Sequence, residues 1–139
     1  LAAGVVLHDL GKIHEMASDA MGLVSEYTTE GLLLGHLVEG AAAVARAGEK
    51  LGTRKELVLM LQHMLISHHD LPEYGSPRRP MFPEAEVLHI LDLLDARMFE
   101  MAHALGQIAP GTFTDRIWSL DRKLYRRLEP DGGEGEGEM

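Results

Sequence analysis

The chain begins with the stretch LAAGVVLHDLGK, residues 1–12, in which seven apolar or small residues lead directly to His8-Asp9. The apolar run predicts a helix over residues 1–16. Successive residues on a helix point about 100° apart, so His8 and Asp9 can turn toward one ligand only where the helix opens. Gly11 tolerates the backbone angles of such an opening, and we expect the helix to break there.

Beyond this stretch, glycine and proline fall between long periodic apolar segments, which favours helices over the short, evenly spaced strands of a barrel. Residues 17–31 and 70–83 are predicted loops, and a short extended segment is expected at 23–25. A second helix is predicted over residues 32–51. The i, i+3, i+4 and i+7 spacing places Leu33, His36, Leu37 and Gly40 on one stripe of this helix.

A third helix is expected to start at Thr53 and Glu56, which have the spacing of a capping box, and to end near residue 68. Apolar stripes predict two more helices, over residues 84–105 and 115–128. The fold class is therefore predicted to be all-α. The stripe residues are Val87, Ile90, Leu91, Leu94 and Met98 in the first, and Ile117, Trp118, Leu120, Leu124 and Leu128 in the second.

The composition is that of an ordinary globular domain, with 139 residues, 45% hydrophobic and 25% charged. No apolar stretch is long enough for a membrane span, so no membrane partner is expected. The absence of cysteine excludes disulfides and thiol catalysis and favours a cytoplasmic location. The net charge of −9 is concentrated in residues 129–139, which carry five acids and no base and are predicted to be a disordered tail.

Eight histidines are present, and several stand beside aspartates in the predicted helices. Each has a simpler explanation when taken alone, because a helix end attracts histidine and an imidazole on an apolar face can bond a carbonyl. Four of the predicted helical segments present such groups toward one interior, however, and this combination predicts a metal site. Donors of this kind suit Mn²⁺, Fe²⁺, Ni²⁺, Zn²⁺ or Mg²⁺. The residues are His8, Asp9, His36, His68, His69, Asp70, Asp92 and Asp95.

Five short motifs stand in order along residues 1–105. They are HDLGK at 8–12, YTTEGLLLGH at 27–36, SHH at 67–69, YGSPRRP at 74–80 and LHILDLLDARM at 88–98. The first resembles the HD motif of metal-dependent HD-superfamily phosphohydrolases. The ordered set resembles the YhaM-type 3′-to-5′ exoribonucleases.

The resemblance implies an HD-domain helical bundle that holds two divalent metal ions, with Mn²⁺ favoured and Asp9 bridging them. It assigns the first ion to His8, Asp9 and Asp92, with Asp95 as the rival of Asp92. It assigns the second ion to Asp9, His36, His68 and His69.

The family also carries parts that this sequence does not match. HD proteins take a further histidine from a preceding helix, but only seven residues precede His8. YhaM-type proteins have an N-terminal OB-like nucleic-acid domain. We therefore expect the chain to be the C-terminal part of a longer protein, with an HD domain over residues 1–128 and an upstream OB-like domain as a partner. A homo-oligomer is compatible with this arrangement.

The implied reaction is phosphodiester hydrolysis, with single-stranded RNA as the expected substrate and metal-activated hydroxide as the attacking group. Asp9 and Lys12 are the expected catalytic residues, although Lys12 alone would equally be a solvated charge. His89 would either orient Asp92 or lie on the helix surface. Two other functions stay open: hydrolysis of nucleotides or cyclic dinucleotides, and a non-catalytic interaction module. The expected substrate-binding residues are Tyr74, Arg78 and Arg79. The alternative is that they lie in a surface loop and do not contact substrate.

Overall fold

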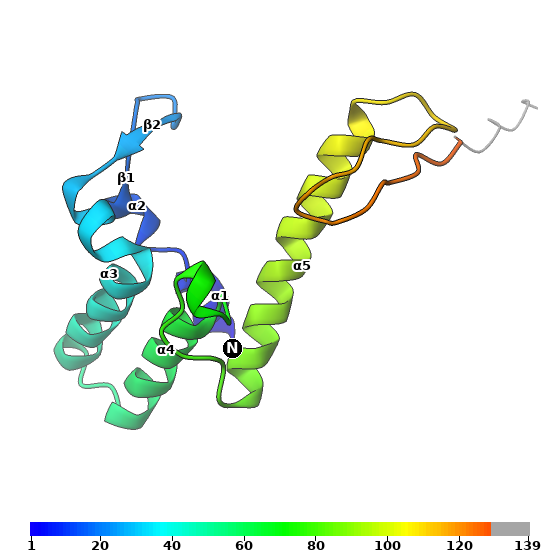
Figure 1. Ribbon diagram of the computed structural model, residues 1–139. Coiled ribbons are helices and arrows are strands. Elements are labelled where there is room, and N and C mark those ends of the chain that lie inside the picture. The colour runs from blue at the N-terminus through cyan, green and yellow to red at the C-terminus, as the bar shows by residue number, and fades with distance from the viewer. Residues whose placement is uncertain (129–139) are drawn as a thin grey trace, which may run out of the picture. The chain divides into compact units, whose positions relative to one another are not determined.

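The computed structural model describes residues 1–128 and is mostly helical, as predicted (Figure 1). It divides into two compact units, Leu1–Leu93 and the residues from Leu94 onward. The elements of the first unit are α1 (Ala2–Leu7), α2 (Lys12–Glu15), β1 (Met16–Ser18), β2 (Val24–Tyr27), α3 (Thr29–Lys50), α4 (Lys55–Ser67), the 3₁₀ turn η1 (Pro72–Tyr74) and the first part of α5 (Pro83–Gly106).

The core of the first unit lies where α3 and α4 pack side by side and α1 lies against α4 (Figure 1). Its most deeply buried side chains come from α4 and α5, where Leu65, Ala85 and Leu88 are almost entirely removed from solvent. Burial of this apolar surface is the main favourable term for such a small unit. The rest of the core consists of Val44 and Met64, with Leu7, Val58, Leu61 and Phe82 packed against them.

The predicted break in the first helix is confirmed, because α1 ends at Leu7 and α2 begins at Lys12. Gly11 lies in this turn for a steric reason. A Cβ on Gly11 would stand 2.2 Å from the carbonyl oxygen of His36, closer than any side chain can approach. Only glycine therefore lets the His8-Asp9 turn pack directly on the backbone of α3.

The second predicted helix forms as α3 but contains a kink at Gly35, whose φ of 72° is left-handed. Such an angle is costly for any residue with a side chain, so glycine permits the change of direction. The helix starts at Thr29, three residues earlier than predicted, because Thr28 caps it and accepts a hydrogen bond from the Gly31 amide. The kink immediately precedes His36.

Two local expectations need correction. The segment predicted to be extended at 23–25 is β2, which pairs antiparallel with β1, so the predicted loop contains a small hairpin. The capping box at Thr53 does not form. α4 has Arg54 as its N-cap, no side chain bonds the helix end, and the helix starts at Lys55.

The apolar stripe that predicts α5 is not the buried face of this helix. Its stripe from Val87 to Met98 is exposed, whereas Ala85 and Leu88 are the residues that reach the core. The helix itself spans Pro83–Gly106, close to the predicted range. This helix is apolar on more than one side. The spacing of its apolar residues therefore predicts a helix but does not predict which side is buried.

The last predicted helix, over residues 115–128, does not form. The described chain instead folds back on itself after α5, with bridges between Phe113 and Tyr125 and between Ile117 and Arg122. Leu124 is buried, but Trp118 is 83% exposed. The spacing of the apolar residues in this segment thus fits two paired extended segments as well as one helix. The predicted disordered tail at 129–139 lies outside the described residues.

Within residues 1–128, no helix combines the length and the apolar character that crossing a bilayer requires.

The contact of Gly11 with α3 predicts the effect of Gly11→Ala. The new methyl group would meet the His36 carbonyl, so urea unfolding should show a loss of about 2 kcal/mol or more. Gly106→Ala is the matched control, because a Cβ there has no atom within 4 Å. Equal stability changes in the two variants would show that the Gly11 contact is not tight.

Candidate metal centre

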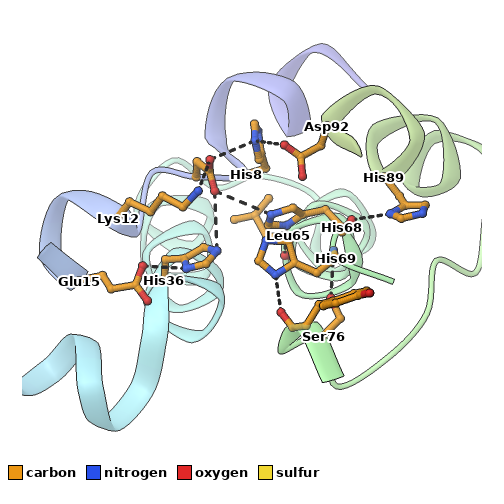
Figure 2. A network of polar contacts seen from close by, with 12 residues as sticks. His8, Lys12, Glu15, His36, Leu65, His68, His69, Ser76, His89 and Asp92 are labelled. Atoms are coloured by element: carbon orange, nitrogen blue, oxygen red, sulfur yellow. Dashed lines mark hydrogen bonds and ion pairs between the residues drawn. The ribbon is translucent and has the colours of Figure 1, made fainter. Parts of the chain in front are cut away.

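Four separate segments of the first unit bring their histidines and aspartates together (Figure 2). His8 and Asp9 come from the turn after α1, and His36 comes from the residue after the kink in α3. The end of α4 supplies two adjacent imidazoles, and α5 supplies one carboxylate. The six residues that the family resemblance assigns as metal ligands therefore meet: His8, Asp9, His36, His68, His69 and Asp92.

Asp9 lies at the centre of this cluster. Its Oδ1 is 3.7 Å from Nε2 of His36 and 3.8 Å from Nε2 of His68, while its Oδ2 is 3.4 Å from Nε2 of His8. Nε2 of His8 is also 3.5 Å from Oδ1 of Asp92. Atoms bonded to one ion at about 2.1 Å lie roughly 3–4 Å from one another, so these separations, which are long for hydrogen bonds, suit shared ions.

Each imidazole of the cluster is held by its Nδ1 atom. His8 donates to the carbonyl of Val5 at 2.9 Å, and His68 donates to the carbonyl of Leu65 at 2.7 Å. His69 donates to the carbonyl of Tyr74 at 2.8 Å. With Nδ1 protonated and bonded, a neutral ring keeps the lone pair of Nε2 for a ligand.

His36 differs from the others because its Nδ1 bonds a side chain. Its partner is Oε2 of Glu15, at 2.8 Å. Both side chains are largely buried, with 12% and 13% of their surfaces exposed. The hydrogen bond again leaves Nε2 directed toward Asp9.

Three buried side-chain atoms in the described chain have no hydrogen-bond partner. They are Oδ1 of Asp9, Nε2 of His36 and Nε2 of His68, and all three belong to this cluster. Burying a polar atom without a partner costs about 1–3 kcal/mol, so three together call for a common explanation. A divalent cation would satisfy all of them, and the donor set is one that such cations use.

The protonation of the cluster matches this interpretation. Burial lowers the pKa of His68 to about 4 and lowers the pKa of His36, so both rings are neutral near pH 7 and can bind a cation. Burial raises the pKa of Asp9, but hydrogen bonds from His8 and Lys12 outweigh it and hold that pKa below its usual range. Asp9 is therefore ionised.

His8 is the positive group of the cluster. Hydrogen bonds with Asp9 and Asp92 raise the pKa of His8 to about 10, and the contact with His8 lowers the pKa of Asp92. The raised pKa places a proton on Nε2 of His8 between two carboxylates, and a metal ion that binds His8 would displace this proton. Charge neutralisation at this position is what a metal ion would otherwise provide.

The remaining nominated residues lie around the cluster. Nζ of Lys12 donates to Oδ2 of Asp9 at 2.7 Å. Tyr74 is 69% exposed, although its carbonyl accepts the bond from His69. Arg78 and Arg79 are exposed, and Nε of Arg79 is 3.8 Å from Oδ1 of Asp70.

Asp95, the rival of Asp92, belongs to the second unit and is exposed. Asp92 is half-buried and contacts His8. The geometry therefore favours Asp92 over Asp95 as the ligand.

The sequence did not reveal Glu15 as the hydrogen-bond partner of His36, and the role expected of His89 was wrong. Glu15 was not nominated, because an acid one turn after Gly11 looks like any charge on a helix surface. His89 neither orients Asp92 nor lies free on the surface, since its Nδ1 donates to the carbonyl of His68 at 2.8 Å. It ties α5 to the end of α4. Both contacts join residues that are 21 positions apart, which local sequence patterns do not reveal.

Comparison with known proteins places the chain among its relatives. The 3′-5′ exoribonuclease YhaM of Bacillus licheniformis is 46% identical over 125 residues, which are 90% of this chain and 39% of that protein. The proteins of the same name from Geobacillus sp. and Bacillus subtilis are 45% and 44% identical, again over 90% of this chain and 38% and 39% of their own lengths. The chain thus spans about two fifths of the length of these relatives. No solved structure matches it.

A sequence model of the HD domain family matches residues 1–97. This range contains every residue of the cluster, from the His-Asp pair that follows α1 to the carboxylate on α5. The chain belongs to the HD domain family.

Proposed function

We propose that this chain is the hydrolytic part of a metal-dependent 3′-to-5′ exoribonuclease that acts on single-stranded RNA. The observation that carries the proposal is the set of three unpartnered buried atoms around Asp9, which is explained by bound cations. The relatives named 3′-5′ exoribonuclease support the choice of reaction.

In the proposed centre two divalent ions share Asp9, because the two oxygens of Asp9 face different histidines. Two groups of residues have donor atoms close enough to hold an ion, and His68 belongs to both. We assign the first ion to His8, Asp9 and Asp92. We assign the second ion to Asp9, His36, His68 and His69.

Bound divalent ions would supply an activated water and would stabilise charge on the phosphate, and Mn²⁺ is our favoured metal. The protein positions the charged and aromatic side chains that would contact the substrate. Lys12 holds its ammonium group beside Asp9, where it can neutralise a nonbridging phosphate oxygen. Arg78 and Arg79 offer positive charge to the following phosphates, and the exposed ring of Tyr74 offers a surface for base stacking.

Firm binding of RNA should depend on more than this domain. Residues 1–128 carry a net charge of −4, and the whole chain has three Phe, three Tyr and one Trp. Binding of single strands normally uses a positive groove and several stacking aromatics. We therefore infer that an OB-like domain of the same protein holds the RNA strand, and that the histidine and aspartate cluster cuts it.

The direct test uses a 5′-labelled single-stranded RNA, Mn²⁺ and a purified protein in which this chain is joined to the proposed OB-like domain. Stepwise shortening from the 3′ end is expected, and Asp9→Ala should reduce it to background because both ions lose a shared ligand. Elemental analysis should find the metal gone from this variant. Two ions still bound to Asp9→Ala would show that the bridging assignment is wrong.

Other outcomes of the same assay decide between functions. Hydrolysis of nucleotides or cyclic dinucleotides without shortening of RNA would indicate a small-molecule phosphohydrolase. Bound metal with no hydrolysis of any phosphodiester would indicate an interaction module.

A second prediction separates the two aspartates of α5. Asp92→Asn should lower turnover by more than the roughly 10- to 100-fold that follows loss of a ligand's hydrogen-bonding partner. Asp95→Asn is the matched control on the same helix, and it should leave turnover close to that of the wild type because Asp95 is exposed. Phosphodiesterase rates of the two variants, measured at saturating Mn²⁺, make the comparison. Greater damage from Asp95→Asn would transfer the ligand role to that residue.

A further inference from the structure

We propose that Glu15 is a positioning residue of the metal centre: its carboxylate fixes the ring of His36 so that Nε2 faces Asp9. This inference rests on the proposed metal centre and adds a residue outside the ligand set. It also predicts that the two metal ions depend on Glu15 unequally, because Glu15 contacts only one of the four imidazoles.

The contact itself is short and sheltered. Oε2 of Glu15 lies 2.8 Å from Nδ1 of His36, and most of the surface of both side chains is buried. A hydrogen bond to a carboxylate is stronger than one to a neutral carbonyl, and low solvent exposure strengthens it further. Such a partner holds a ligating imidazole in one tautomer and orientation and makes Nε2 a better donor.

The other three imidazoles do not need a side-chain partner. His8 bonds a carbonyl three residues earlier, at Val5, and His68 does the same with Leu65. His69 bonds the carbonyl of Tyr74, five residues later. These three rings are held by their own local backbone, whereas His36 is held from a different element.

The kink in α3 explains this difference. Gly35 is left-handed, so the helical turn that leads up to Gly35 does not continue into His36 and does not set the direction of its ring. Glu15 approaches this kink closely, since its Oε1 would be 3.7 Å from a Cβ on Gly35. The carboxylate therefore supplies the orientation that the interrupted helix does not.

Glu15 is in turn fixed by the start of α3. Its carbonyl accepts a hydrogen bond from the Thr28 amide at 2.9 Å. The Thr28 hydroxyl, which caps α3, also donates to the carbonyl of His14 at 2.7 Å. The end of α2 is thus joined to the beginning of α3, and the Glu15 side chain spans from that junction to His36. This rigid support is what a residue that orients a metal ligand requires.

The test measures Mn²⁺ binding by the whole chain, using calorimetry for affinity and elemental analysis for the number of ions. Glu15→Gln keeps the size of the side chain and removes its charge. It should weaken one of two Mn²⁺ ions roughly 10- to 100-fold and leave the other unchanged. The Tm of the metal-free protein should stay within about 3 °C of the wild type. Glu30→Gln is the matched control, because it removes the same charge from an exposed position in the first turn of α3 and should leave both ions unchanged.

The possible results are distinguishable. Binding of both ions to Glu15→Gln with wild-type affinity would overturn the positioning role while leaving the metal centre intact. Equal weakening of both ions together with a lower metal-free Tm would also overturn it, because Glu15 would then be only a structural contact. Failure of the wild type to bind Mn²⁺ would instead overturn the proposed metal centre on which this inference rests.

Discussion

Within residues 1–128, three buried polar atoms without hydrogen-bond partners are the constraint on which the fold depends. Oδ1 of Asp9 and the Nε2 atoms of His36 and His68 face one another at distances too long for hydrogen bonds. A folded chain keeps such an arrangement only if something else satisfies it. The helical scaffold can be understood as the means of bringing these atoms together, and a cation as the means of stabilising them.

Close backbone packing makes this convergence possible. The His8-Asp9 turn can lie against α3 only because Gly11 has no side chain, and the left-handed Gly35 redirects α3 just before His36. On the other side, His89 ties α5 to the last turn of α4 through the carbonyl of His68. The hydrophobic core around Leu65 and Leu88 then holds these elements in place. Fold stability and ligand geometry therefore rest on the same contacts.

The sequence predicted which residues meet in the cluster better than it predicted the packing. The His-Asp pair, the later histidines and Asp92 were singled out because their motifs resemble those of the family, and the structure brings them together. Glu15 was missed, since its bond to His36 crosses between elements. Apolar periodicity failed where two arrangements share it. One example is the exposed stripe of α5. The other is the chain around Leu124, where extended segments pair across a turn instead of forming a helix.

The central claim is that the unpartnered atoms around Asp9 are metal ligands. The most direct measurement is anomalous diffraction from crystals of the protein grown with Mn²⁺. We expect an anomalous peak within about 2.3 Å of Oδ1 of Asp9 and of Nε2 of His36 or His68, as metal coordination requires. Peaks only elsewhere on the protein, with ordered water alone between these three atoms, would contradict the account.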